Sequence, residues 1–170
     1  MASIKLGKKE IPLKLTVPAM KNIEKQIGGD ISKIGEYIQY GSTKVKVTKD
    51  ENGEEIVKDL NTGKIIKKKT TTDKLINIVG IIRHMANGYV AKNNADVDFG
   101  IIEGEKLNFY DEELFLNVFD ISDFGQLKSV LYETIAEDTT FNVPDGVKLK
   151  NSEEVDVVLQ EIEAEKSKNE

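Results

Sequence analysis

Residues 72–90, TDKLINIVGIIRHMANGYV, form the most apolar stretch of the chain and decide how the rest can fold. Apolar residues recur here at spacings of three and four, which predicts a helix, and they cover much more than one narrow stripe of its surface. The residues are Leu75, Ile76, Ile78, Val79, Ile81, Ile82, Met85, Tyr89 and Val90. Thr72 is a good N-cap residue, and Asp73 in the first turn is favoured by the helix dipole. We therefore predict a central helix that other elements enclose.

Composition sets the class of protein. The chain has 170 residues, enough for one domain with a substantial core, and 32% of them are charged, with a net charge of −6. This acidity argues against a dedicated nucleic-acid binder, which usually carries a basic patch. The lack of cysteine excludes disulfides, cysteine-ligated metals and thiol catalysis. No apolar run approaches the roughly 20 residues that span a bilayer, and residues 1–10 lack a signal-peptide core, so we expect no membrane partner and a cytoplasmic location.

The N-terminal third predicts a hairpin followed by two helices. Apolar and polar residues alternate over residues 3–15, which indicates two short strands around a polar turn. Thr16 is predicted to cap a helix that ends at Gly28, and Asp30 to cap a second helix that ends at Gly41.

Residues 43–70 differ from the rest and predict a small inserted β-arm. β-Branched segments are separated by ENG and NTG, which are turn sequences. Lysines outnumber acids in this arm: Lys44, Lys46, Lys49, Lys58, Lys64, Lys67, Lys68 and Lys69. Two interpretations remain open, a solvated arm whose lysines discourage edge pairing and a docking arm for an acidic surface.

Beyond the central helix, residues 93–104 are expected to form a loop that exposes Asp96 and Asp98. The remaining positions of a calcium-binding EF-hand do not follow, so no metal site is predicted.

Two amphipathic helices are then predicted to cover the central one. The first presents one apolar face, made of Leu114, Phe115, Val118 and Phe119. Ser122 or Asp123 is predicted to cap the second, which carries Leu127, Val130, Leu131 and Ile135.

Residues 151–170 predict an acidic C-terminal helix or flexible tail. Asn151 and Glu154 fit a capping box, and an apolar stripe follows: Val155, Val158, Leu159 and Ile162. A helix with so short a stripe is marginal alone, so we expect order only against a partner or a neighbouring copy. The predicted organisation is a single α+β domain over residues 1–150, a mainly helical bundle around the central apolar helix, with an N-terminal β-hairpin and the small inserted β-arm.

The sequence offers no catalytic constellation. His84 is the only histidine and lies in the most apolar helix, which is more typical of a structural residue. No serine occupies a G-x-S-x-G turn, and neither a Walker loop nor G-x-G-x-x-G is present. We predict no catalytic, cofactor-binding or metal-binding residue and a protein that is not an enzyme.

The opening IKLGKKEIPLKLTVPAMKNIEKQIGGDISKIGEYI resembles the start of the tail assembly chaperones of tailed bacteriophages and prophages. That family often has a short strand with G-K, a second apolar strand, and a helix of the form L-x-x-[IL]-E that ends in glycine. The matching positions are Gly7, Lys8, Leu13, Leu15, Ile23, Glu24 and Gly28. Residues 75–89 and 111–135 are similar to the helical second half of the family, whereas the β-arm departs from its usual compact form.

The resemblance implies a non-enzymatic protein that binds the tape measure protein, keeps this long helical rod soluble, and releases it as tail tube protein polymerises. It also implies self-association, which the sequence by itself only permits. Candidate contact residues are the aromatic cluster Phe115, Phe119 and Phe124 and the stripe Val155, Val158, Leu159 and Ile162, with core packing as the alternative for each. The alternative function is a structural tail component, such as a tube or connector subunit, in which strands should dominate. An enzyme of unrecognised type is a further alternative.

Overall fold

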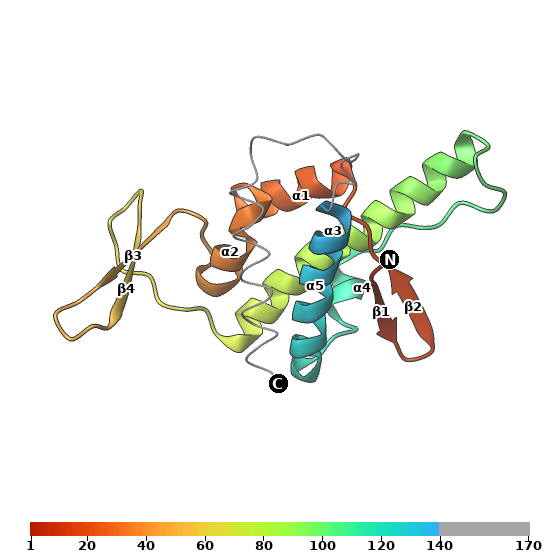
Figure 1. Ribbon diagram of the computed structural model, residues 1–170. Helices are drawn as coiled ribbons and strands as arrows, with labels where there is room; N and C mark the ends of the chain where they lie inside the picture. Colours follow the sequence, from red (N-terminus) through yellow and green to blue (C-terminus); the bar gives the residue numbers. More distant parts are fainter. Residues whose placement is uncertain (140–170) are drawn as a thin grey trace, which may run out of the picture.

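The computed structural model describes residues 1–139. Within them, five α-helices, two short 3-10 helices and two antiparallel two-stranded hairpins follow one another along the chain (Figure 1). This is the predicted α+β class. The helices form the body, the first hairpin packs at its side, and the second hairpin extends away from it (Figure 1).

The central helix α3, Thr71–Asp98, crosses the whole body (Figure 1). Its buried side chains include seven of the nine apolar residues named above: Leu75, Ile78, Val79, Ile81, Ile82, Met85 and Val90. The other two are not fully buried, since Ile76 is 49% exposed and Tyr89 is half-buried. The predicted cap was wrong, because Thr70 rather than Thr72 accepts the hydrogen bond from the Asp73 amide.

Helix α3 is longer than the sequence predicted, and the loop expected from residue 93 begins only after Asp98. An ion pair between Lys92 and Asp96 joins successive turns of this extension. The side chain of Asn94 binds the backbone of Leu107 from the segment that returns along the helix. These contacts outweigh the weak helix propensity of the two adjacent asparagines.

The N-terminal hairpin pairs β1, Ser3–Leu6, with β2, Lys9–Pro12. Ile4 and Ile11 are direct cross-strand partners and are both buried. The second strand was predicted to continue to residue 15 and instead ends at Pro12. The chain stays close to α3 beyond this point, since the Lys14 amide donates to the Met85 carbonyl over 3.1 Å.

Two helices follow this hairpin. Helix α1, Val17–Ile27, begins at the predicted cap Thr16 and ends at Gly28 in the left-handed conformation. Asp30 caps a 3-10 turn, Ile31–Lys33, that leads into α2, Ile34–Tyr40. Local sequence therefore determined the ends of this region.

The β-arm has the predicted hairpin form. Strand β3, Val45–Lys49, pairs with β4, Glu55–Asp59. A single bridge from Lys58 to Ile65 adds a short third segment.

The C-terminal part of the described chain covers α3, as predicted, but with different element boundaries. Helix α4 is only Glu112–Leu116, so Leu114 and Val118 do not share a buried face with Phe115 and are 64% and 46% exposed. Asp120, not Ser122 or Asp123, caps the 3-10 turn Ile121–Asp123 through a capping box. Helix α5, Phe124–Thr139, then packs Leu127, Val130, Leu131 and Ile135 into the core, as predicted.

The predicted C-terminal helix and its stripe of Val155, Val158, Leu159 and Ile162 lie outside the described residues, as does the predicted domain boundary at residue 150. Among the described helices, none is long and apolar enough to cross a membrane.

Candidate functional site

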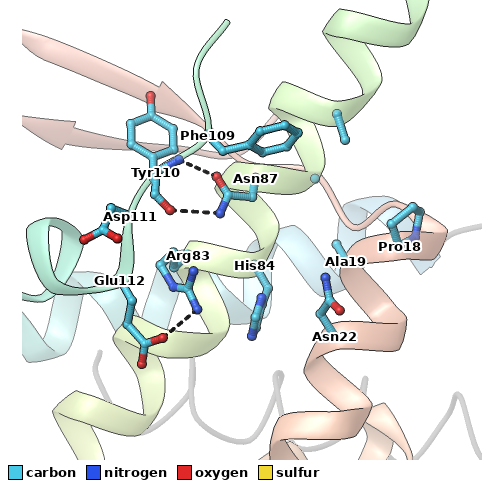
Figure 2. Close-up of a pocket in the computed structure, with 12 residues that line it drawn as sticks. Pro18, Ala19, Asn22, Arg83, His84, Asn87, Phe109, Tyr110, Asp111 and Glu112 are labelled. Carbon is cyan, nitrogen blue, oxygen red and sulfur yellow. Dashed lines mark hydrogen bonds and ion pairs between the residues drawn. The ribbon is translucent and has the colours of Figure 1, made fainter.

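The described part of the chain has an open groove of about 770 Å³. One wall is α1, the base is α3, and the other wall is the segment that returns from the end of α3 (Figure 2). Its lining residues come from three stretches that are far apart in sequence: residues 18–22, 83–91 and 109–112. We call this hollow the α1–α3 groove.

Small residues form the base of the groove. Ala19 on α1 faces Gly88 on α3, and Ala91 continues the same surface one turn later. A Cβ atom on Gly88 would lie 2.4 Å from the Lys14 carbonyl oxygen and 2.9 Å from the Ala19 Cβ, so only glycine fits. The two helices can therefore approach closely. Ala19 and Gly88 are buried by this contact, and Ala91, which is half-buried, is the one of the three that stays open to a partner.

Two asparagines fix the outer wall. Asn87 donates from Nδ2 to the Tyr110 carbonyl over 3.1 Å, and its Oδ1 accepts from the Tyr110 amide over 2.7 Å (Figure 2). Asn94, seven residues later, makes the same pair of bonds with Leu107, at 2.9 and 2.8 Å. Seven residues are close to two helical turns, so both amides project from one side of α3. Each asparagine side chain binds both the backbone N–H and the backbone carbonyl of one residue, so the returning segment is held along the helix.

Exposed apolar side chains line the groove at two places. Phe109, held between the two asparagine contacts, is 61% exposed, and its ring lies over the α3 side of the groove (Figure 2). Pro18, at the start of α1, is exposed and lines the opposite wall. A partner that enters the groove would therefore meet apolar contacts at both walls.

The other end of the groove is polar. Arg83 Nη2 and Glu112 Oε2 form an ion pair of 3.1 Å across it (Figure 2). The Arg83 side chain is only 18% exposed, while that of Glu112 is 68% exposed. Because one partner is this exposed, the pair fixes geometry more than it stabilises the fold.

His84 lies beside this ion pair and faces the groove (Figure 2). Burial lowers the pKa of His84 below 6.5, the neighbouring Arg83 charge lowers it further, and Glu112 opposes both effects. The imidazole is therefore neutral at pH 7 and can both donate and accept a hydrogen bond. Among residues 1–139, no group of three or more histidine, cysteine or acidic side chains is placed to hold a metal ion.

The sequence-predicted contact residues lie elsewhere. Phe115 is 2% exposed, and its ring packs against Phe119 at 5.3 Å and Tyr110 at 5.6 Å between ring centroids. Phe119 and Phe124 are half-buried and pack on the core. The structure therefore places this cluster mainly inside the body, while Val155, Val158, Leu159 and Ile162 lie outside the described residues.

Sequence reasoning missed the groove itself. The available signal was the spacing of Asn87 and Asn94, two amide side chains seven residues apart and so on one side of the central helix. Their partners, Leu107 and Tyr110, could not be identified from that spacing.

Comparison with protein-family models, with curated proteins and with solved structures found no match. Function is therefore inferred from the residues and from the geometry of the groove.

Proposed function

We propose that this protein is a tail assembly chaperone of a tailed phage or prophage, and that the α1–α3 groove receives a helical segment of the tape measure protein. The chaperone keeps this client soluble and releases it while tail tube protein polymerises. It does so by binding, without catalysis, in the cytoplasm of the bacterial host.

The residues that carry the family resemblance support this proposal by their positions. Gly7, with a φ of 59°, makes the hairpin turn, and Gly28, with a φ of 70°, ends α1. Leu13 and Ile23 are buried in the core. The residues similar to the chaperone family thus build the hairpin and α1, and α1 is one wall of the groove.

The observation that carries the proposal is an open groove between two helices whose walls expose Pro18 and Phe109. An amphipathic helix binds in such a groove by laying its apolar face on it, with anchor residues spaced by three and four positions. Ala91 is half-buried at the base of the groove, and its small side chain allows that helix to approach closely there. A long helical rod such as a tape measure protein offers many segments of this kind.

Charge supports the same role. The groove wall ends in Asp111 and Glu112, and the whole chain carries a net charge of −6. An acidic chaperone bound along an apolar rod would keep the complex soluble through mutual repulsion.

The test is co-expression of the full chain with the tape measure protein encoded beside it, followed by pull-down and size-exclusion chromatography with light scattering. We expect a soluble complex, and a client that is insoluble when it is expressed alone.

Two matched variants locate the contact. Phe109→Asp should abolish or strongly weaken the complex, because it places a charge at the apolar border of the groove. Leu114→Asp is the control, since Leu114 is 64% exposed, close to the 61% of Phe109, and is not a lining residue of the groove. Equal binding by both variants would place the client elsewhere. A client that is soluble alone and forms no complex would refute the chaperone proposal and favour a structural tail component, such as a tube or connector subunit.

A further inference from the structure

The β-arm is a basic element on an acidic protein. Residues 43–70 contain eight lysines and five acidic side chains, although the whole chain has a net charge of −6. Within residues 1–139, none of these eight lysines forms an ion pair. Their charge is available to another surface.

Two of these lysines lie directly opposite each other. Lys46 on β3 pairs in register with Lys58 on β4, and both side chains are exposed. Residues in direct register point to the same face of a hairpin, and like charges at such positions are destabilising. An anionic group placed over this pair would remove the repulsion.

The β-arm also exposes apolar side chains. Val47, Leu60 and Ile65 are 51%, 62% and 67% exposed. Val47 lies on the face of the hairpin opposite to Lys46 and Lys58, because successive strand residues point to opposite faces. The arm thus exposes both apolar side chains and lysines that form no ion pair with a described residue.

The opposite end of the molecule has the complementary character. We call it the tip: the end of α3 and the segment that follows, residues 92–108, where four acidic side chains accompany two lysines. Both lysines form ion pairs within the tip, Lys92 with Asp96 and Lys106 with Asp98. Glu103 and Glu105 are exposed and form no ion pair with any described residue.

The tip exposes several large apolar side chains. Phe99 is 82% exposed and Ile101 is 68% exposed, and Ile102 and Leu107 add 40% and 42%. This is a cluster from one short stretch of chain and not a set of scattered residues, so it marks an interaction surface.

The arm and the tip project from opposite ends of the body, the arm beyond α2 and the tip beyond the hairpin β1–β2 (Figure 1). They therefore cannot meet within one molecule in this arrangement. We propose that the β-arm of one copy of this chain docks on the tip of the next copy, with Lys46 and Lys58 facing Glu103 and Glu105. The contact is head-to-tail, so it joins different surfaces and extends copy by copy into a chain or a closed ring.

Sedimentation velocity of the full chain tests this proposal, in low salt and in 1 M NaCl. We expect association that increases with protein concentration and weakens in high salt, because the Debye length falls from about 10 Å at 0.1 M to about 3 Å at 1 M. Reversal of the arm, Lys46→Glu with Lys58→Glu, should raise the dissociation constant by about tenfold or more, as should reversal of the tip, Glu103→Lys with Glu105→Lys.

Mixing the two variants gives the sharper test. A reversed arm is complementary to a reversed tip, and the unmodified arm of one variant is complementary to the unmodified tip of the other. An equimolar mixture should therefore associate as the original chain does, although each variant alone does not. Circular dichroism and thermal unfolding of each variant check that these exposed substitutions leave the fold intact.

A chain that stays monomeric at all concentrations would overturn the proposal, as would variants that associate normally or a mixture that does not recover. If only the charge reversal of the arm weakens association, the arm binds another acidic surface, such as the acidic residues 151–170, and the assignment of the tip is wrong. The experiment contains no client, so its outcome is independent of the chaperone proposal.

Discussion

Gly88→Ala tests the close approach on which the groove depends. Gly88 is buried in α3, where the helix passes the segment that leads into α1. An added Cβ would lie 2.4 Å from the Lys14 carbonyl oxygen, 2.9 Å from the Ala19 Cβ and 3.0 Å from the Thr16 hydroxyl. The nearest atom belongs to the backbone, so no rotamer change relieves the overlap, and α3 must move away from the α1 segment.

The expected free energy change is the difference of two effects. Alanine stabilises a helix interior by about 1 kcal/mol relative to glycine. Overpacking of a well-packed site costs about 1–3 kcal/mol, and the backbone overlap here places the cost near 3 kcal/mol. We therefore expect Gly88→Ala to lower the free energy of unfolding by about 2 kcal/mol.

Gly80→Ala is a matched control in the same helix. An added Cβ at Gly80 would meet only the end of the Gln26 side chain, with Nε2 at 2.9 Å and Oε1 at 3.1 Å. That side chain can rotate away, losing its 3.4 Å hydrogen bond to the Asn77 carbonyl. The helix gain should then dominate, and the variant should be more stable by up to about 1 kcal/mol.

Urea unfolding followed by circular dichroism at 222 nm measures both variants against the original chain. The difference between them should be about 3 kcal/mol, from the sum of the two expected changes. If Gly88→Ala is as stable as Gly80→Ala, the helices are not in contact at Gly88 and the proposed base of the groove is wrong.

Two further predictions concern the polar residues of the groove. Asn87→Ala should speed hydrogen exchange at the Tyr110 amide and leave the Leu107 amide protected, because each asparagine accepts from one of these amides. Asn94→Ala should speed exchange at the Leu107 amide and leave the Tyr110 amide protected. Equal effects at both amides would show that the segment detaches as a unit. The pKa of His84 is lowered in the folded chain by burial, so the unfolded chain binds this proton more readily. Its contribution to stability is therefore complete above about pH 6.5 and is lost as the pH falls below that value. His84→Gln should flatten the decrease in unfolding free energy with falling pH, and an unchanged slope would show that other groups cause it.

Local sequence determined the elements whose ends are set within a few residues. Thr16 capped α1, Gly28 and Gly41 ended α1 and α2 in the left-handed conformation, and Gly7 made the hairpin turn. In each case the hydrogen bonds or the φ angle concern adjacent residues, so a short stretch contains the whole reason. The periodicity of residues 72–90 likewise predicted the central helix, because amphipathic spacing depends only on helix geometry.

Only the tertiary structure decided where α3 ends and where the groove lies. Asn93 and Asn94 are weak helix formers, and the sequence alone favoured a loop there. The helix continues because Asn94 finds its partner thirteen residues away, in Leu107.

The same limit applies to the candidate site. The α1–α3 groove needs residues 18–22, 83–91 and 109–112 to meet, and no periodicity within one of these stretches specifies the other two. The sequence by itself thus determined the class, the central helix and most turns, because those depend on local conformation and on hydrophobic burial. The groove, and the placement of the β-arm and the tip at opposite ends, were decided by packing between distant segments (Figure 1).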